Sequence, residues 1–190
     1  MKRMEQKILQ DGKIVNEHVL LVDSFINNQI DVELMAECGK EFARHYKDAG
    51  ITRICTVESS GIAPAVMTAY EMKLPLVVLK KSKSAILKED ILQTEVYSFT
   101  KESYYQLTLK KKFIQPGDRV LLIDDFLANG EVVKGSAQLI EAAGATLAGI
   151  GILICKAAQP GYKLLKEKGY DLHCLAKVAD MTEGVLHFEE

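Results

Sequence analysis

The chain has 190 residues, of which 48% are hydrophobic and 26% charged, and its formal net charge is −2 at pH 7. This length suits one domain with a substantial core. No apolar run approaches the roughly 20 residues of a membrane span, and the N-terminal segment is too polar for a secretory signal. The slightly acidic balance gives no support for nucleic-acid binding. These features favour a single cytoplasmic globular domain.

Helix and strand signals alternate through the first half of the chain. Asp31 is a candidate N-cap for a helix that runs to about residue 48, and Gly50 stops it. Residues 51–57, "ITRICTV", predict a strand, and the turn "ESSG" leads from it into an apolar helix over about 62–72. Pro75 then opens the strand "PLVVLK".

The second half begins with a change of character. Residues 82–103 are rich in Lys, Ser, Thr and Glu and show no sustained apolar period, which predicts a long polar loop. The elements expected after it are a strand at 104–109, a strand at 119–123 ending in an Asp-Asp turn, a helix at about 130–143, a strand at 146–156, a short helix near 161–168 and two last strands, "DLHCLAKV" and "GVLHFEE".

This alternation predicts an α/β fold with an open, mostly parallel sheet covered by helices on both faces. In such sheets ligands bind outside the carboxyl ends of the strands. Three polar segments leave predicted strands at that end: "VESSG", "LKKSK" and "IDDFLANGEV". We therefore expect the functional site where these three segments meet.

The segment around Asp124 and Asp125 carries the clearest chemistry. The small residues of the loop 128–132 let backbone N–H groups approach an anion at the start of a helix, where the helix dipole favours a phosphate. The two carboxylates would repel a phosphate but can accept hydrogen bonds from sugar hydroxyls. A ribose with a terminal phosphate satisfies both halves. The structural alternative is an acidic pair that serves only as a turn and helix entry.

Other polar groups leave more than one interpretation open. Residues 58–61 form either an anion-binding nest or a simple helix cap, and Lys80, Lys81 and Lys83 form either a solvated face or a contact to an anion. The four cysteines lack metal-ligand spacing and are expected to be buried thiols. The four histidines are scattered and indicate no histidine-based catalytic group.

The motif "VLLIDDFLANGEV" resembles the phosphoribosyl-diphosphate (PRPP) signature of type I phosphoribosyltransferases, in which an apolar strand leads through two acids to a small loop. The match departs at Asn129, where the signature usually has Thr or Ser, and at Glu131 and Val132, where Gly-Thr is common. Losing these hydroxyls leaves more of the phosphate coordination to backbone N–H groups, and the anion site remains.

Five segments extend the resemblance over nearly the whole chain: "VDSFINNQID", "ESSGIAPAVMT", "YSFT", "IDDFLANGE" and "AGIGILICKAAQPG". In order and spacing they are similar to the xanthine-using branch of this family. The resemblance implies one phosphoribosyltransferase domain over 1–190, with a five-stranded parallel core at about 36–155. It also implies a hood over the base from about 1–35 and 156–190, and a flexible flap at about 82–103.

The resemblance assigns the site residues by position. Asp124 and Asp125 would hold the ribose hydroxyls. The PRPP-binding residues would be Glu58, Ser59, Ser60, Gly61, Lys81, Ala128, Asn129, Gly130, Glu131 and Val132. Leu20, Asn27 and Lys156 would contact xanthine. By residue type alone, these last three suit a core residue, a turn residue and a lysine at a strand end whose charge reaches solvent.

The implied reaction is transfer of the 5-phosphoribosyl group from PRPP to N9 of xanthine, giving XMP and diphosphate. Guanine and hypoxanthine would be weaker acceptors. The co-substrate implies Mg²⁺, held through PRPP and water and by no direct protein ligand. The resemblance also implies a homodimer. Two alternatives remain: a PRPP-sensing regulator without catalysis, and a phosphoribosyltransferase for another base such as adenine or orotate.

Overall fold

The computed structural model describes residues 1–15, 19–82, 89–99, 102–181 and 185–189. Its helices are α1 (Lys2–Asp11), α2 (Val32–His45), α3 (Ile62–Met72), α4 (Glu131–Ala142) and α5 (Pro160–Glu167), with a π-helical turn at Asp23–Asn27 and a 3₁₀ turn at Lys111–Phe113. Its strands are β1 (Lys13–Val15), β2 (Val19–Leu21), β3 (Arg53–Val57), β4 (Leu76–Ser82), β5 (Ile91–Ser98), β6 (Ser103–Lys110), β7 (Arg119–Leu127), β8 (Thr146–Lys156), β9 (Leu172–Asp180) and β10 (His187–Phe188).

The main sheet has the strand order β10-β9-β8-β7-β3-β4-β6-β5. Its middle five strands, β9, β8, β7, β3 and β4, run parallel, which confirms the predicted parallel core. Antiparallel strands extend the sheet at both edges, β10 at one and the β5–β6 pair at the other, so the sheet is wider than predicted. β1 and β2 form a separate hairpin.

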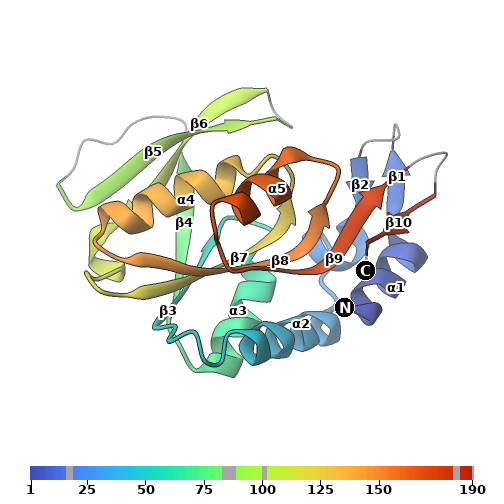
Figure 1. Cartoon of the computed structure of the whole chain (residues 1–190), viewed down its shortest axis with the longest axis horizontal. Coiled ribbons are helices and arrows are strands. Elements are labelled where there is room, and N and C mark those ends of the chain that lie inside the picture. Colours follow the sequence, from blue (N-terminus) through green and yellow to red (C-terminus); the bar gives the residue numbers. More distant parts are fainter. Residues whose placement is uncertain (16–18, 83–88, 100–101, 182–184, 190) are drawn as a thin grey trace.

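Helices cover both faces of the sheet, as the sequence predicted (Figure 1). One hydrophobic cluster lies between the sheet and α4 and α5, and the other lies between the sheet and α1, α2 and α3. The predicted N-cap is confirmed, because the Asp31 side chain accepts a hydrogen bond from the Leu34 N–H at 3.0 Å. Phe42 of α2 is fully buried, and the Tyr46 hydroxyl donates to the Ile150 carbonyl of β8 at 2.8 Å. α2 is thereby fixed beneath the sheet.

The predicted Asp-Asp turn is wrong. β7 does not end at Ile123 but continues through both acids to Leu127, because β8 stays paired with it as far as Cys155. On the other side of β7, pairing with β3 stops at Thr56 and Ile123. The last four residues of β7 therefore extend beyond β3, which opens one side of the strand.

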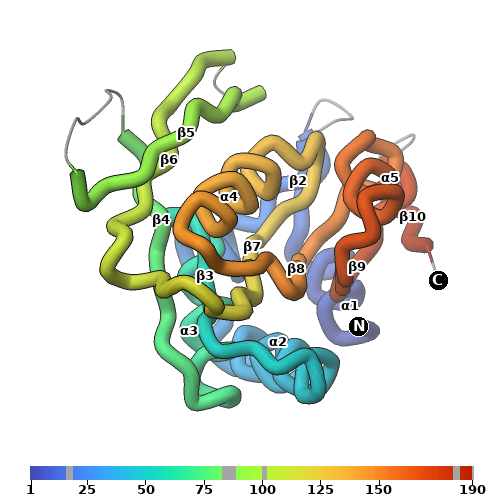
Figure 2. Tube along the Cα trace, turned by 60° about the vertical axis from the view of Figure 1, so that its left-hand side comes forward, coloured from blue at the N-terminus to red at the C-terminus, as the bar shows by residue number. Residues whose placement is uncertain are grey.

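The predicted long polar loop at 82–103 is also wrong in part. Residues 91–98 form β5, which pairs with all of β6 in an antiparallel hairpin. Figures 1 and 2 show this hairpin at the edge of the sheet beside α4. Thr94 Oγ1 and Gln138 Oε1 of α4 are hydrogen-bonded at 2.7 Å. Residues 83–88, with Lys83, and residues 100–101 lie outside the described residues, and the flap stays a prediction.

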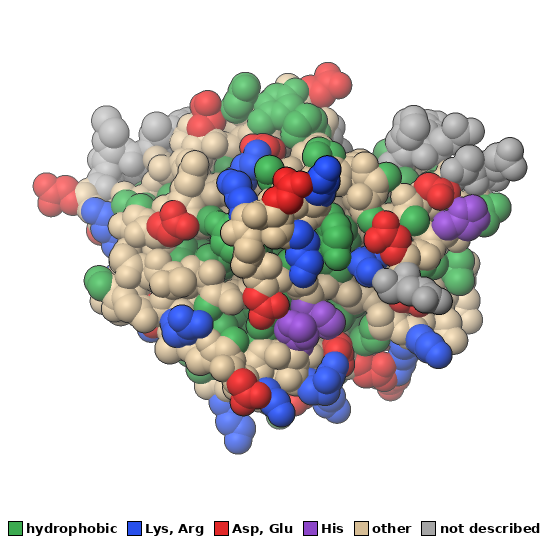
Figure 3. Space-filling model, viewed as in Figure 1, with side chains coloured by type: hydrophobic (Ala, Val, Ile, Leu, Met, Phe, Trp, Pro, Cys, Tyr) green, Lys and Arg blue, Asp and Glu red, His purple; other side chains and the backbone are tan. Residues whose placement is uncertain are grey.

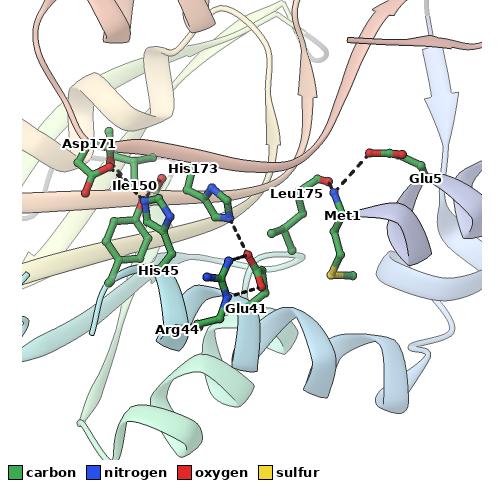
Figure 4. Close-up of polar contacts among 10 residues, drawn as sticks. Met1, Glu5, Glu41, Arg44, His45, Ile150, Asp171, His173 and Leu175 are labelled. Carbon is green, nitrogen blue, oxygen red and sulfur yellow. Dashed lines mark hydrogen bonds and ion pairs between the residues drawn. The ribbon is translucent and has the colours of Figure 1, made fainter. Parts of the chain in front are cut away.

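The two ends of the chain meet at β9 and contain elements that the sequence did not predict. The amino group of Met1 donates to the Leu175 carbonyl of β9 and lies 3.3 Å from a carboxylate oxygen of Glu5 (Figure 4). Met4 and Ile8 of α1 are fully buried. Of the strand predicted at 184–190, only His187–Phe188 is a strand among the described residues. The division into core and hood stays a prediction.

Acidic and basic side chains are interspersed over the face drawn in Figure 3. This mixture agrees with the near-neutral formal charge of −2. Within the described residues, the helices include no segment with the length and apolar character that a membrane span requires.

Candidate active site

A pocket of about 290 Å³ lies at the carboxyl ends of the parallel strands. It is lined by the last residue of β3 and the three that follow it (57–60), by Lys81 near the end of β4, by 97–99 and Tyr105 of the β5–β6 hairpin, and by 124–133 of β7 and α4. The three polar segments predicted to meet do meet here.

The two adjacent acids have different surroundings. Asp124 is buried, with 7% of its surface exposed, and its Oδ1 accepts a hydrogen bond from the Asp125 N–H at 3.0 Å. Burial is the main cause that raises the pKa of Asp124 well above its ordinary value, and the negative charge of Asp125 is the second. Asp125 is half-buried and lines the pocket. The sequence analysis gave both acids the same role, whereas in the fold Asp124 is buried and Asp125 is more accessible.

The loop after β7 leads directly into α4. Gly130 has φ +84° and is the N-cap, a conformation that favours glycine. No side chain among the described residues caps this helix, so its first N–H groups are available to an anion in the pocket. The Glu131 carboxylate is paired with Lys134 Nζ at 2.6 Å, which draws its charge toward the helix surface. The geometry suits a phosphate held by backbone N–H groups.

Glu58 connects the ends of β3 and β4. One carboxylate oxygen accepts a hydrogen bond from Lys80 Nζ at 2.9 Å, and the other accepts one from the Lys81 N–H at 2.6 Å. The hydrogen bond from Lys80 is the main cause that lowers the pKa of Glu58. Glu58 lines the pocket together with Ser59 and Ser60. Because both of its carboxylate oxygens have protein partners, Glu58 is placed to orient the loop.

Gly61 lies behind the pocket wall, where its lack of a side chain is required. A Cβ atom there would stand 2.4 Å from Thr56 Oγ1 and 2.9 Å from Asp124 Oδ1. The Thr56 hydroxyl is fully buried and has no hydrogen-bond partner among the described residues. Thr56 reads in the sequence as an ordinary strand residue, so its position beside Asp124 was missed.

Lys81 extends over an aromatic ring of the hairpin. Its Nζ lies 5.4 Å from the centre of the Tyr105 ring, within the range of a cation–π contact. Burial raises the pKa of Tyr105 to about 12, with a smaller contribution from Asp124. Tyr97 and Phe99 line the same wall. The sequence analysis quoted Tyr97 and Phe99 only within the segment "YSFT" and gave no site role to any of these aromatic residues, because residues 82–103 were interpreted as a polar loop.

The three residues expected at the base do not line this pocket. Leu20 is buried at 5% exposure in β2, and Asn27 is exposed at the end of the π-helical turn. Lys156 is half-buried, and its Nζ lies 5.8 Å from the centre of the Phe126 ring. Burial lowers the pKa of Lys156.

Phe126 links Lys156 and the hydrophobic cluster that contains Leu20 to the pocket. It lines the pocket next to Asp125 and also packs against the hydrophobic cluster that contains Leu20. The sequence analysis did not identify Phe126, although its place directly after the acidic pair at a strand end was a usable signal.

Comparison with known proteins agrees with this geometry. Residues 29–188 match the family described as phosphoribosyl transferase domain. The chain is 53% identical over 190 residues to the xanthine phosphoribosyltransferase of Clostridium botulinum strain Eklund 17B, covering all of both chains. It is 48% identical over 188 residues to that of Acinetobacter baylyi, covering 99% of this chain and 98% of the relative.

Among solved structures, the fold resembles adenine phosphoribosyltransferases. That of Thermoanaerobacter pseudethanolicus has a TM-score of 0.76 at 22% identity, covering 92% of this chain and 99% of the other. That of Trypanosoma brucei has a TM-score of 0.75 at 23% identity, covering 92% and 79%. These two show the fold, and the full-length relatives show the family. The chain belongs to the phosphoribosyltransferase family.

Proposed function

We propose that this chain transfers the 5-phosphoribosyl group of PRPP to N9 of xanthine, giving XMP and diphosphate. The observation that carries the proposal is a single pocket that joins an acidic pair to the uncapped start of α4. A ribose that carries phosphate groups matches both halves, because hydroxyls donate to carboxylates and a phosphate accepts from N–H groups. Full-length relatives named xanthine phosphoribosyltransferase support the choice of acceptor.

In this proposal the pocket positions PRPP in three places. Asp125, supported by Asp124, accepts hydrogen bonds from the ribose hydroxyls, and backbone N–H groups of 128–132 hold the 5-phosphate. Ser59 and Ser60 with Lys81 face the diphosphate. Positive charge develops on the ribose as diphosphate leaves, and the nearby carboxylate stabilises it. The hairpin wall at Tyr97 and Phe99 limits access of water, which competes with the base.

A divalent cation fits this chemistry. The Asp125 carboxylate is placed to accept hydrogen bonds from the water shell of a magnesium ion that arrives with PRPP, since Mg²⁺ retains several waters and binds phosphate oxygens. Such an ion would neutralise charge on the diphosphate as it departs. Within the described part of the chain, no group of three or more His, Cys, Asp or Glu is placed to hold a metal.

For the base we propose Phe126 together with Leu20, Asn27 and Lys156. An ammonium and an amide suit the oxygen-rich edge of xanthine, and apolar side chains suit its faces. The 5.8 Å approach of Lys156 Nζ to Phe126 supports placing this cation next to the pocket. Adenine presents an amino group instead, which a lysine disfavours.

We also propose a homodimer in the cytoplasm. Val66 and Tyr70 of α3 are 46% and 77% exposed and offer an apolar surface to a second copy.

The test is an acceptor panel of xanthine, guanine, hypoxanthine, adenine and orotate with PRPP and Mg²⁺. Xanthine is expected to have the highest kcat/KM, and another base in that place would contradict the assignment. Lys156→Met, which keeps most of the apolar stem, is the matched variant. It is expected to raise the KM for xanthine by at least about tenfold, the effect of losing a hydrogen bond to a charged group, and to leave the KM for PRPP unchanged. Equal effects on both would remove Lys156 from the base site.

A further inference from the structure

Gly161, the second residue of α5, lies against the loop 128–132, which we call the phosphate loop, but does not line the pocket. Its N–H donates to the Ala128 carbonyl at 3.0 Å. A Cβ at Gly161 would stand 2.3 Å from the Ala128 carbonyl oxygen, 2.8 Å from Gly130 N and 2.9 Å from the Asn129 carbonyl carbon. All three are backbone atoms of the loop proposed to hold the 5-phosphate.

The loop has little freedom to move away from such a contact. Gly130 is held at φ +84° at the start of α4, and a Cβ there would lie 3.4 Å from the Gly161 Cα. Gly161 itself is buried. Two glycines thus let the backbone of α5 and the backbone of the phosphate loop come into direct contact. A side chain at Gly161 would have to move three backbone atoms by several tenths of an ångström.

We propose that Gly161 is a positioning residue for the 5-phosphate of PRPP, acting through its contact with the loop 128–130. Its N–H and its missing side chain together set where the loop N–H groups point. The inference rests on the proposed function, because it assumes that this loop binds the 5-phosphate.

The same segment reaches Lys156, yet the base end is fixed separately. The Gln159 N–H donates to the Lys156 carbonyl at 3.0 Å, and the Ala157 N–H donates to the Val178 carbonyl of β9 at 2.8 Å. A displacement at Gly161 is therefore expected to affect the phosphate loop more than Lys156.

The test compares Gly161→Ala with Gly39→Ala. A Cβ at Gly39 would also meet backbone, 2.6 Å from the Met67 carbonyl carbon, in the α2–α3 contact away from the pocket. Calorimetric titration with ribose 5-phosphate probes the loop, and titration with inorganic diphosphate probes the other half of the pocket. Steady-state kinetics give the KM for PRPP and for xanthine, and thermal unfolding gives the stability of each variant.

Gly161→Ala is expected to weaken ribose 5-phosphate binding and to raise the KM for PRPP by at least about tenfold, the scale of a sub-ångström misplacement of a binding group. Its diphosphate affinity and its KM for xanthine are expected to stay at wild-type values. Gly39→Ala is expected to lose stability and keep all ligand constants. Unchanged ribose 5-phosphate binding in Gly161→Ala, or an equal loss for both probes, would overturn the role of Gly161.

Hydrogen–deuterium exchange on the wild-type protein provides a second measurement that needs no variant. Exchange at the first turn of α5 is expected to slow when ribose 5-phosphate binds and to stay unchanged with diphosphate. If bound ribose 5-phosphate leaves this exchange unaltered, the contact does not serve the site. A wild-type protein that binds neither probe would contradict the proposed function itself, and with it the role of Gly161.

Discussion

At the scale of single residues, the two adjacent acids differ in what the fold does with them. Asp124 is enclosed by Gly61 and by the Asp125 N–H, and its burial raises its pKa. Asp125 faces the pocket with more of its surface accessible. In the proposed function, Asp125 is therefore the residue placed to contact the ribose, and Asp124 has a supporting position.

Asp125→Asn is expected to lower kcat by at least about 100-fold, the scale seen when one group that stabilises developing charge is removed. Stability is expected to change little, since the amide keeps the shape of the side chain. Turnover with PRPP and xanthine and chemical unfolding are the measurements.

Asp118→Asn is the matched control. Asp118 accepts hydrogen bonds from Thr52 Oγ1 at 2.8 Å and Arg53 Nε at 3.1 Å, at the opposite end of β7. This variant is expected to lose about 1–3 kcal/mol of unfolding free energy and keep turnover. A large loss of stability in Asp125→Asn with turnover retained would favour a purely structural role.

At the scale of elements, the contact between α4 and β5 fixes the hairpin over the pocket. A Cβ at Gly135 of α4 would stand 2.5 Å from Val96 Cγ2 of β5 and at least 3.4 Å from its next neighbours. Val96 is the buried residue of β5, at 3% exposure. One small residue on the helix therefore admits one branched residue on the strand.

Gly135→Ala is expected to destabilise the wild-type protein by about 1–3 kcal/mol through overpacking. In a Val96→Ala background the same change is expected to be stabilising by about 0.5–1 kcal/mol, because the space is free and alanine favours a helix over glycine. Urea unfolding of the four proteins of this cycle measures the coupling. The same sign in both backgrounds would show that the two residues do not compete for space.

Elements also show where sequence reasoning succeeds and fails. The helix after Asp31 and the strand before Asp124 were predicted because capping and apolar runs are local signals. β5 was missed because it is an edge strand with one buried residue, and its stability comes from pairing with β6. β7 was cut short because the pairing with β8 that carries it past the acids is not visible in its own residues.

The candidate site divides in the same way. The acids and the phosphate loop follow one another in the chain, so the sequence alone predicted that they form one site for a ribose that carries a phosphate. Tyr105, Phe126 and Gly161 contact residues that are distant in sequence or in a different element, and a single sequence does not contain that information.

At the scale of the whole molecule, α2 and β9 are joined by a histidine stack. The rings of His45 and His173 are 4.0 Å apart at 9°, with His45 Nε2 3.3 Å from Asp171 Oδ1 and His173 Nε2 3.4 Å from Glu41 Oε1 (Figure 4). Burial, and then the neighbouring His45, lower the pKa of His173 below its ordinary value of 6.5, and Glu41 opposes this shift. The amino group of Met1 lowers it slightly further.

This shift predicts that the protein loses stability as the pH falls below about 6.5. Between the lowered pKa of His173 and 6.5, the unfolded chain binds more protons than the folded chain. The unfolding free energy therefore rises with pH in that window, and above it the contribution of His173 is fully present. His173→Gln is expected to flatten the curve of unfolding free energy below about pH 6.5, where the unfolded chain binds the additional proton. Curves that run parallel for the two proteins would show that His173 titrates alike folded and unfolded.

The continuation of β7 beyond β3 also bears on how the protein avoids edge-to-edge pairing of its sheet with another chain. An unpaired strand edge ordinarily invites pairing with another chain, and proteins protect such edges. Here the free edge of residues 124–127 lies in the wall of the pocket, closed in by the loop 58–60 and by the hairpin. The unpaired edge of β7 is thus accessible to a small ligand in the pocket but shielded from a strand of another molecule.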